Sequence, residues 1–256
     1  MKRFLRVCKE LCFPPCCVGC GERLEPAIGG KAVPYFCAKC ASLWQRALVG
    51  QCSECHRAFF ECDCQTPLMK RAGSEGLLKV ASYDTEKVGD PMVYAIRNLK
   101  KHPRERVLEC LANEMSTVLK KHIEKDEKWS VSHTVIAHIP RARRKIRLLG
   151  FDQAGLLARK LSRLTGIPYL PLLQRARDGG EQKKLTQRAR QENLKNAFSV
   201  KESPRGLVVI LVDDVVTTGA GMAEATRLLR RNGALRVLCL SAALTPKRKH
   251  HARENT

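Results

Sequence analysis

The sequence predicts an α/β fold: a parallel sheet flanked by helices, preceded by a small cysteine-rich module. Two observations support this prediction. Apolar runs of about six residues alternate with amphipathic helical patterns through the last two thirds of the chain, and uninterrupted apolar runs are typical of strands buried on both faces of a parallel sheet. In addition, 11 of the 13 cysteines lie within the first 64 residues, where paired thiols indicate a metal-binding module.

Length and composition limit the possibilities. The 256 residues can form one α/β domain of roughly 150–180 residues and a small module beside it. No apolar run reaches the roughly 18 residues of a transmembrane helix, and charged residues interrupt the N-terminal segment where a signal peptide would have its apolar core. We therefore expect a cytoplasmic protein, whose thiols stay reduced and are available to metal rather than to disulfides.

The cysteine module is predicted to occupy residues 1–65 and to bind structural zinc. Its candidate ligands form pairs: Cys17 with Cys20, Cys37 with Cys40, Cys52 with Cys55, and Cys62 with Cys64. Each pair can present two thiolates from a tight turn to one tetrahedral ion. Two consecutive zinc ribbons and a single site drawn from both halves both stay open, and His56 is a spare ligand. Cys8, Cys12 and Cys16 share one side of a short helix, as small buried cysteines or, less commonly, iron–sulfur ligands.

After a linker at residues 66–78, helices and strands alternate. The predicted elements are a strand at Leu78–Tyr83, helices at Pro91–Lys101 and from Pro103 to about Lys125, a strand at His133–Ile139, a helix at Gly150–Leu164 and a short strand at Tyr169–Leu173. The helices follow from apolar residues at a spacing of 3.6, and Pro and Gly mark their limits. This alternation is typical of a parallel sheet.

Two basic segments follow predicted strands. Five of the seven residues from Arg141 to Arg147 are basic, and a loop there could hold pyrophosphate oxygens through Arg143, Arg144 and Lys145, be an ordinary solvated loop, or contact nucleic acid. The polar segment Arg175–Asn196 contains adjacent glycines, and we expect a mobile segment that closes over a substrate, tracks a DNA backbone, or is a plain loop.

The most informative stretch lies near the C-terminus. The apolar run Leu207–Val212 ends in Asp213-Asp214, and a small polar loop leads into a helix at Met222–Arg231 and a strand at Leu235–Leu240. Open α/β sheets bind ligands at the carboxyl ends of their strands, and backbone amides at a helix start can cradle a phosphate. The two carboxylates could accept hydrogen bonds from ribose hydroxyls or hold the waters of Mg²⁺.

This stretch resembles the phosphoribosyl pyrophosphate (PRPP) signature of type I phosphoribosyltransferases, in which two acids follow a hydrophobic strand and precede Thr-Thr-Gly. Further motifs occur in a specific order: Leu99-Lys100, a strand ending at Pro140, Gly150-Phe151-Asp152-Gln153, Gln187–Arg190 and Asn193–Phe198. Together with the cysteine pairs, from about Phe13 to Leu244, they resemble the ComF family of competence proteins. The resemblance implies a type I phosphoribosyltransferase-like sheet at residues 79–245, after the zinc ribbon and before a basic disordered tail at 246–256.

The resemblance also implies a ligand and its binding residues. Asp213 and Asp214 would be the catalytic pair that meets the ribose of PRPP and its Mg²⁺, while Thr217, Thr218 and Gly219 would hold the 5′-phosphate. The full PRPP-binding set would be Asp213, Asp214, Val215, Val216, Thr217, Thr218, Gly219, Ala220, Gly221, Arg143, Arg144 and Lys145. The chain departs from the family pattern at three positions: Leu149 replaces an arginine, Asp152 an asparagine and Gly221 a threonine.

Two functions of different classes follow. The first is an enzyme that transfers phosphoribose from PRPP, either in natural transformation or in nucleotide metabolism with an unidentified acceptor. The second is a catalytically degenerate adaptor that binds single-stranded DNA during uptake, together with other DNA-uptake or recombination proteins. The formal charge of +22 would attract such a polyanion, although general basicity is an alternative explanation of that charge.

Overall fold

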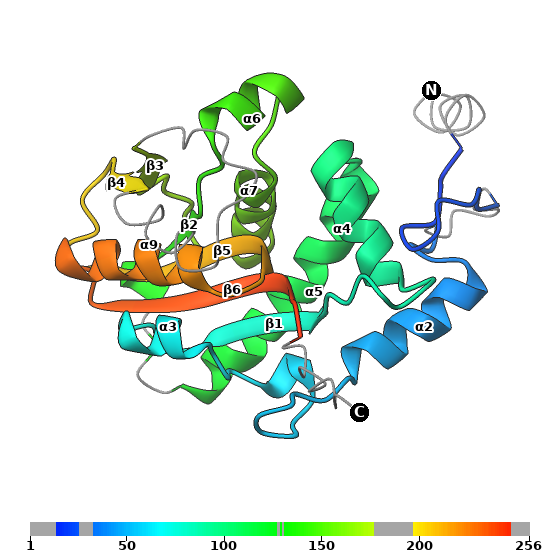
Figure 1. The fold of residues 1–256 in the computed structure, drawn as a ribbon, viewed down its shortest axis with the longest axis horizontal. Helices are drawn as coiled ribbons and strands as arrows, with labels where there is room; N and C mark the ends of the chain where they lie inside the picture. Colours follow the sequence, from blue (N-terminus) through cyan, green and yellow to red (C-terminus); the bar gives the residue numbers. More distant parts are fainter. Residues whose placement is uncertain (1–13, 26–32, 127–128, 130, 177–196, 247–256) are drawn as a thin grey trace, which may run out of the picture.

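The computed structural model describes residues 14–25, 33–126, 129, 131–176 and 197–246. Its centre is a four-stranded parallel sheet in the order β1-β6-β5-β2 (Figure 1). The strands are β1 (Leu77–Ser82), β2 (Thr134–His138), β5 (Val208–Val216) and β6 (Arg236–Leu244). The carboxyl ends of all four strands therefore point to one edge of the sheet, as the apolar runs predicted.

Strand β5 is longer than predicted. The apolar run was expected to end at Val212, but the strand continues through both aspartates because Val215 and Val216 still pair with Ala243 and Leu244 of β6. Strand β2 stops earlier, where His138 pairs with Val212. The two aspartates therefore have a strand neighbour on one side only, and their other side faces the segment that follows β2.

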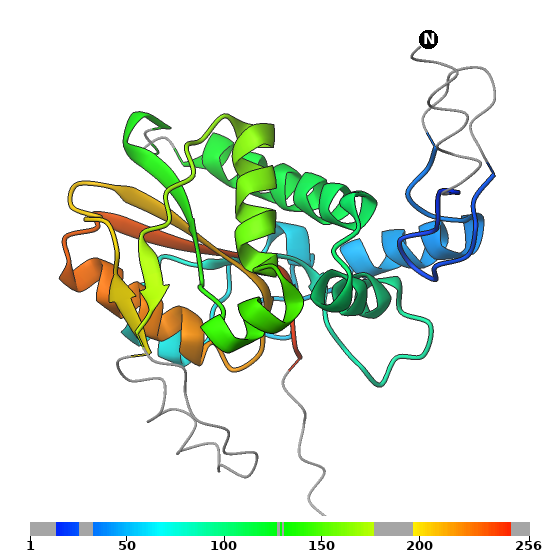
Figure 2. The same ribbon diagram turned by 90° about the horizontal axis from the view of Figure 1, so that it is seen from above.

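Helices cover both faces of the sheet. One face carries α4 (Pro91–Lys101), α5 (Glu105–Lys125) and α7 (Gln153–Thr165), while the other carries α3 (Pro67–Arg71) and α9 (Ala220–Arg231) (Figure 2). Alternate residues of β5 serve the two faces, since Ile210 packs with the first group and Val209 and Leu211 with the second. This period of two explains why the run carries no polar residue before the aspartates.

The basic segment after β2 is partly helical, which corrects the prediction of a loop. Helix α6 spans Arg143–Leu149 and ends at Gly150, whose φ of 80° is left-handed. The next helix, α7, begins at Gln153 rather than at Gly150, because the Asp152 side chain accepts a hydrogen bond from the amide of Gly155. A capping aspartate and a terminating glycine set these limits, which the apolar period alone did not reveal.

Other segments also differ from the expectation. The strand predicted at Tyr169–Leu173 is replaced by a single bridge between Tyr169 and Ile136 and by an antiparallel hairpin of β3 (Leu173–Arg175) and β4 (Phe198–Val200). A short 3-10 turn, η3 (Val131–His133), precedes β2. Residues 66–78, expected as a linker, include α3 and the start of β1, and Met69 of α3 is fully buried against the sheet.

The cysteine-rich part contains helix α2 (Ala38–Leu48) and the 3-10 turn η2 (Phe59–Glu61). It packs on the α/β part through Trp44, which is buried and donates from Nε1 to Glu114 of α5 at 3.0 Å. The expectations for Cys8 and Cys12, for most of segment 175–196 and for the tail from 247 onward lie outside the described residues. No helix in the described part of the chain is long and apolar enough to cross a membrane.

Candidate ribose-phosphate site and cysteine sites

Asp214 is the buried member of the acid pair, and three elements hold its carboxylate. Only 5% of the residue is exposed. Its Oδ2 lies 3.6 Å from Nζ of Lys100 at the end of α4 and accepts from Nε2 of Gln153, the first residue of α7, at 3.3 Å. Its Oδ1 accepts from the amide of Val215 at 2.9 Å. A cation and an amide therefore fix this carboxylate at the carboxyl edge of the sheet.

The contacts continue from Gln153 into the segment after β2. Arg141 donates from its guanidinium to Oε1 of Gln153 at 2.5 Å and from its amide to Asp152 at 2.8 Å. Asp152 also lies 3.6 Å from Nε2 of His138, whose Nδ1 contacts the Tyr169 hydroxyl at 3.0 Å. Burial acts to raise the pKa of Asp152, but the hydrogen bonds from His138 and Arg141 outweigh it and hold the pKa below its usual range.

The pKa of Asp213 is shifted in the opposite direction from that of Asp152. The residue is partly buried, and its Oδ1 accepts from the amide of Asp214 at 2.8 Å. Burial, and then the neighbouring Asp214 carboxylate, raises the pKa of Asp213 well above its usual range. A carboxylate in this position is stabilised by any ligand that brings a cation or a hydroxyl donor, which is the chemistry of Mg²⁺ and of a sugar diol.

The loop after β5 forms a small turn at the start of α9. Thr217 and Thr218 are exposed, and Gly219 takes a left-handed conformation with φ of 76°. A Cβ at Gly219 would lie 2.5 Å from Oγ1 of Thr66, whereas a Cβ at Gly221 would meet nothing within 4 Å. Glycine is thus required at 219, while the space at 221 would accept the threonine that the family usually has.

The other residues predicted for this site lie at different places. Val215 and Val216 are buried in β5, and Ala220 opens α9. Arg143, Arg144 and Lys145 are exposed on the first turn of α6. In the segment after β2, Arg141 contacts Gln153, which in turn donates to Asp214.

Sequence reasoning did not assign a site role to Lys100, Gln153 or Arg141. The available signal was their position: Lys100 lies at the end of α4, Gln153 at the start of α7, and Arg141 in the short segment between β2 and α6.

The eight paired cysteines form two separate quartets. Cys17, Cys20, Cys37 and Cys40 make the first quartet, Cys52, Cys55, Cys62 and Cys64 make the second, and within each the four sulfurs lie within 4.8 Å of one another. The structure therefore favours two sites over one site drawn from both halves. A tetrahedral zinc–thiolate site has sulfurs about 3.8 Å apart, and the Cys20 and Cys37 sulfurs lie at 3.8 Å. The donor set fits zinc or a similar soft divalent ion.

The two quartets are built on equivalent turns. The amide of Gly21 donates to the Cys17 carbonyl and the amide of His56 to the Cys52 carbonyl, both at 2.9 Å. Gly21 and His56 both have positive φ, 80° and 57°. His56 is exposed and stands outside the group of ligand atoms, so it fills a turn position and not the ligand position that was considered for it.

The second quartet lies beside the loop that follows β5. A pocket of about 130 Å³ is lined by Thr217, by Ser82 and Leu244 at the ends of β1 and β6, and by Cys52 and Cys64. The cysteine module and the candidate ribose-phosphate site therefore share one edge of the sheet.

Comparison with known proteins identifies the family. Residues 147–255 match the phosphoribosyl transferase domain family. The DNA utilization protein YhgH of Escherichia coli O157:H7 is 30% identical over 237 residues, which are 91% of this chain and 100% of that protein. The chain belongs to the ComF family.

Other relatives of this ComF protein share shorter stretches. Competence protein F of Haemophilus influenzae is 42% identical over 88 residues, 33% of this chain and 38% of that protein. Competence protein ComFC of Bacillus subtilis is 35% identical over 102 residues, 40% of each chain. A purine phosphoribosyltransferase structure from Pyrococcus horikoshii is 12% identical and covers 58% of this chain and 93% of its own, with a TM-score of 0.30.

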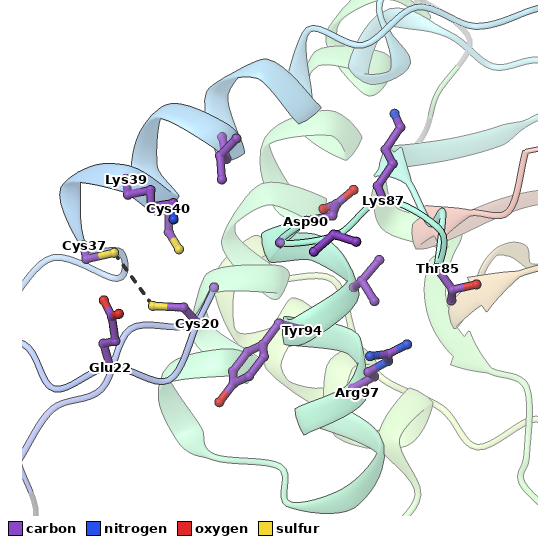
Figure 3. A pocket seen from close by; sticks show the side chains of 15 residues that line it. Cys20, Glu22, Cys37, Lys39, Cys40, Thr85, Lys87, Asp90, Tyr94 and Arg97 are labelled. Carbon is purple, nitrogen blue, oxygen red and sulfur yellow. Dashed lines mark hydrogen bonds between the residues drawn. The ribbon is translucent and has the colours of Figure 1, made fainter.

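The ComF protein has a second pocket, of about 420 Å³, between the first quartet and α4 (Figure 3). Cys20 and Cys37 line one side of it, and Tyr94 and Arg97 of α4 line the other. Gly21 makes this close approach possible, because a Cβ there would lie 2.0 Å from the Tyr94 hydroxyl oxygen. Lys39 and Lys87 also line the pocket, as do the acids Glu22 and Asp90, and the Asp90 carboxylate caps α4 by accepting from the amide of Met92.

Proposed function

We propose that this ComF protein binds PRPP with Mg²⁺ at the carboxyl edge of β5 and acts in the cytoplasm on imported single-stranded DNA in natural transformation. One observation carries the PRPP proposal: Asp213 and Asp214 lie near the carboxyl end of a buried parallel strand, which ends at Val216 just before a turn with a left-handed glycine that opens helix α9. Relatives named for competence and DNA utilization support the biological role.

Different site residues would contact different parts of PRPP. In the turn from Thr217 to Gly219, the threonine hydroxyls and the backbone amides at the N-terminus of α9 would donate hydrogen bonds to the 5′-phosphate. Asp213 would accept hydrogen bonds from ribose hydroxyls, while Lys100 and Gln153 keep Asp214 in position beside it. Mg²⁺, when bound, would neutralise the pyrophosphate charge as that group leaves.

Positioning and electrostatic stabilisation would supply most of any rate enhancement. The transfer would pass through an oxocarbenium-like ribose, whose developing charge the two aspartates face. Binding of PRPP without transfer to an acceptor is the alternative.

Calorimetric titration with PRPP and Mg²⁺ tests the binding step. We expect saturable binding that Asp213→Asn reduces at least tenfold, because the diol and the metal lose a carboxylate. Glu202→Gln is the matched control, since Glu202 is exposed and the variant makes the same change of charge. Equal affinities for wild type and Asp213→Asn would refute the proposal.

An adaptor that binds single-stranded DNA is the second candidate, and the pocket of Figure 3 favours it. Lys39, Lys87 and Arg97 line that pocket with Tyr94, and Arg97 stands one helical turn before Lys100 on α4. Cations beside an aromatic ring are suited to single-stranded DNA, because the cations can contact its phosphates while the ring stacks on a base.

DNA affinity measured at several salt concentrations tests this candidate. Lys87→Ala and Arg97→Ala should each flatten the dependence of log affinity on log salt by about 0.7. The triple change of Arg143, Arg144 and Lys145 to alanine measures the contribution of α6. A DNA affinity that no salt concentration alters would exclude contact through phosphates.

A further inference from the structure

Lys79 is a buried cation inside the sheet. It lies in β1, where every residue from Leu77 to Ala81 is buried, and none of its own surface is exposed. Lysines are almost never fully buried unless another charge pairs with them. The position therefore requires a nearby source of negative charge.

The Lys79 ammonium is directed at the second cysteine quartet. Its Nζ donates to the Cys62 sulfur at 3.1 Å, to the Cys64 carbonyl at 3.0 Å, to the Cys62 carbonyl at 3.3 Å and to the Leu77 carbonyl at 3.2 Å. Among the described residues, no carboxylate pairs with Lys79. Three of its four partners thus belong to the segment that carries two of the second quartet's ligands.

Charge explains the arrangement. Four thiolates around a divalent ion carry a net charge of −2, which a buried ammonium at 3.1 Å reduces to −1. Without a metal–thiolate group, the ammonium would have only carbonyl dipoles and a thiol as partners. Sulfurs of both quartets accept from backbone amides, Cys17 from those of Gly19 and Cys37, and Cys62 from that of Cys64, each at 3.3 Å, but among the described residues only the second quartet also has an ammonium donor. The two quartets therefore differ in their surroundings.

We propose that Lys79 is the internal counter-cation of a metal–thiolate site at Cys52, Cys55, Cys62 and Cys64, and that it links metal binding at this site to the stability of the sheet. The ligand is a soft divalent cation such as Zn²⁺. Metal binding stabilises β1 by giving Lys79 its counter-charge, and Lys79 stabilises the metal by offsetting the charge of the thiolates.

Lys79→Met tests the link, because methionine keeps the length of the side chain and removes its charge. Zinc-loaded protein is incubated with a chelator and N-ethylmaleimide, and the alkylated cysteines are located by peptide mass spectrometry, which follows the two quartets separately. We expect metal loss from the second quartet to be about tenfold faster or more, and loss from the first to change less than about twofold. Lys70→Met, at an exposed position of α3, controls for total charge.

Thermal unfolding gives an independent test, in which the melting temperatures of zinc-loaded and metal-free protein should change in opposite directions. Lys79→Met should lower the melting temperature of zinc-loaded protein and raise that of metal-free protein, because the metal-free chain no longer buries an unpaired charge. If Lys79→Met does not accumulate, Lys79→Gln, which keeps a donor without the charge, is measured in the same way. Unchanged metal loss, equal acceleration at both quartets, or a lower melting temperature in both forms would overturn the proposal.

Discussion

Nζ of Lys100 lies 3.6 Å from Oδ2 of Asp214, and this contact joins the end of α4 to the candidate ribose site. The same helix contributes Tyr94 to the pocket beside the first cysteine quartet. Helix α4 therefore connects the cysteine module to the carboxyl edge of the sheet, and a change at either of its ends affects a different site.

Removing the Lys100 charge should destabilise the fold. In Lys100→Met the buried Asp214 carboxylate keeps Gln153 as its side-chain donor, and we expect a loss of about 1 kcal/mol, since Lys100 is itself partly exposed. Urea denaturation at pH 7 measures the change. Lys101→Met is the control, because Lys101 is the exposed next residue of the same helix. A loss of equal size in both variants would show that the pair with Asp214 contributes nothing specific.

The two glycines at the start of α9 should respond in opposite ways to alanine. Gly219→Ala introduces a Cβ at a left-handed φ of 76° and 2.5 Å from Oγ1 of Thr66, so we expect a loss of about 2 kcal/mol or more. Gly221→Ala meets open space inside a helix and should gain up to about 1 kcal/mol. Denaturant titration of both variants tests the pair, and similar losses would contradict the described turn.

The acid pair could be predicted from the sequence because its signal is local. An apolar strand, two acids and a small turn follow one another within about fifteen residues, and the paired cysteines are equally local. Lys100, Arg141 and Gln153 were missed as site residues because their role depends on how the end of α4, the segment after β2 and the start of α7 are placed in three dimensions. No spacing in the sequence reveals that those three segments meet at β5.

The missed helix α6 has a different cause. Its residues Arg143–Leu149 include four cations and no buried side chain, so the apolar period that identifies a packed helix is absent. The 66–78 segment was interpreted by its polarity, although Met69 within it is fully buried. Helix α6 is thus too exposed, and α3 too short, for an apolar period to identify them.

Asp213 and Asp152 should shift the pH dependence of stability in opposite directions. The pKa of Asp213 is raised in the fold, so the folded state binds more protons than the unfolded state, and stability falls as pH rises from about 4 to the raised value. Asp213→Asn should therefore raise the melting temperature at pH 7 and flatten this slope.

The pKa of Asp152 is lowered, so its contribution is present above about pH 4 and is lost as pH falls through the lowered value. Asp152→Asn should accordingly lower the melting temperature at pH 7. Calorimetric scans of both variants from about pH 2 to pH 8 measure the two effects, because the Asp152 contribution is lost below about pH 4. A decrease at pH 7 for Asp213→Asn would mean that its carboxylate is satisfied in the free protein, contrary to its surroundings.

His56 provides a test of the second quartet's ligand set. His56 has a left-handed backbone conformation, with φ of 57°, in the turn of the second quartet. Gly21 holds the equivalent position in the turn of the first quartet. His56→Gly should therefore stabilise the protein by about 1 kcal/mol, because a non-glycine residue is strained at that φ, while the metal content per chain should equal that of the wild type. Elemental analysis together with thermal unfolding measures both quantities. Gly21→Ala is the reciprocal change and should destabilise strongly, since its Cβ would meet the Tyr94 hydroxyl. Loss of one ion in His56→Gly would instead make the imidazole a ligand and one of the four cysteines a bystander.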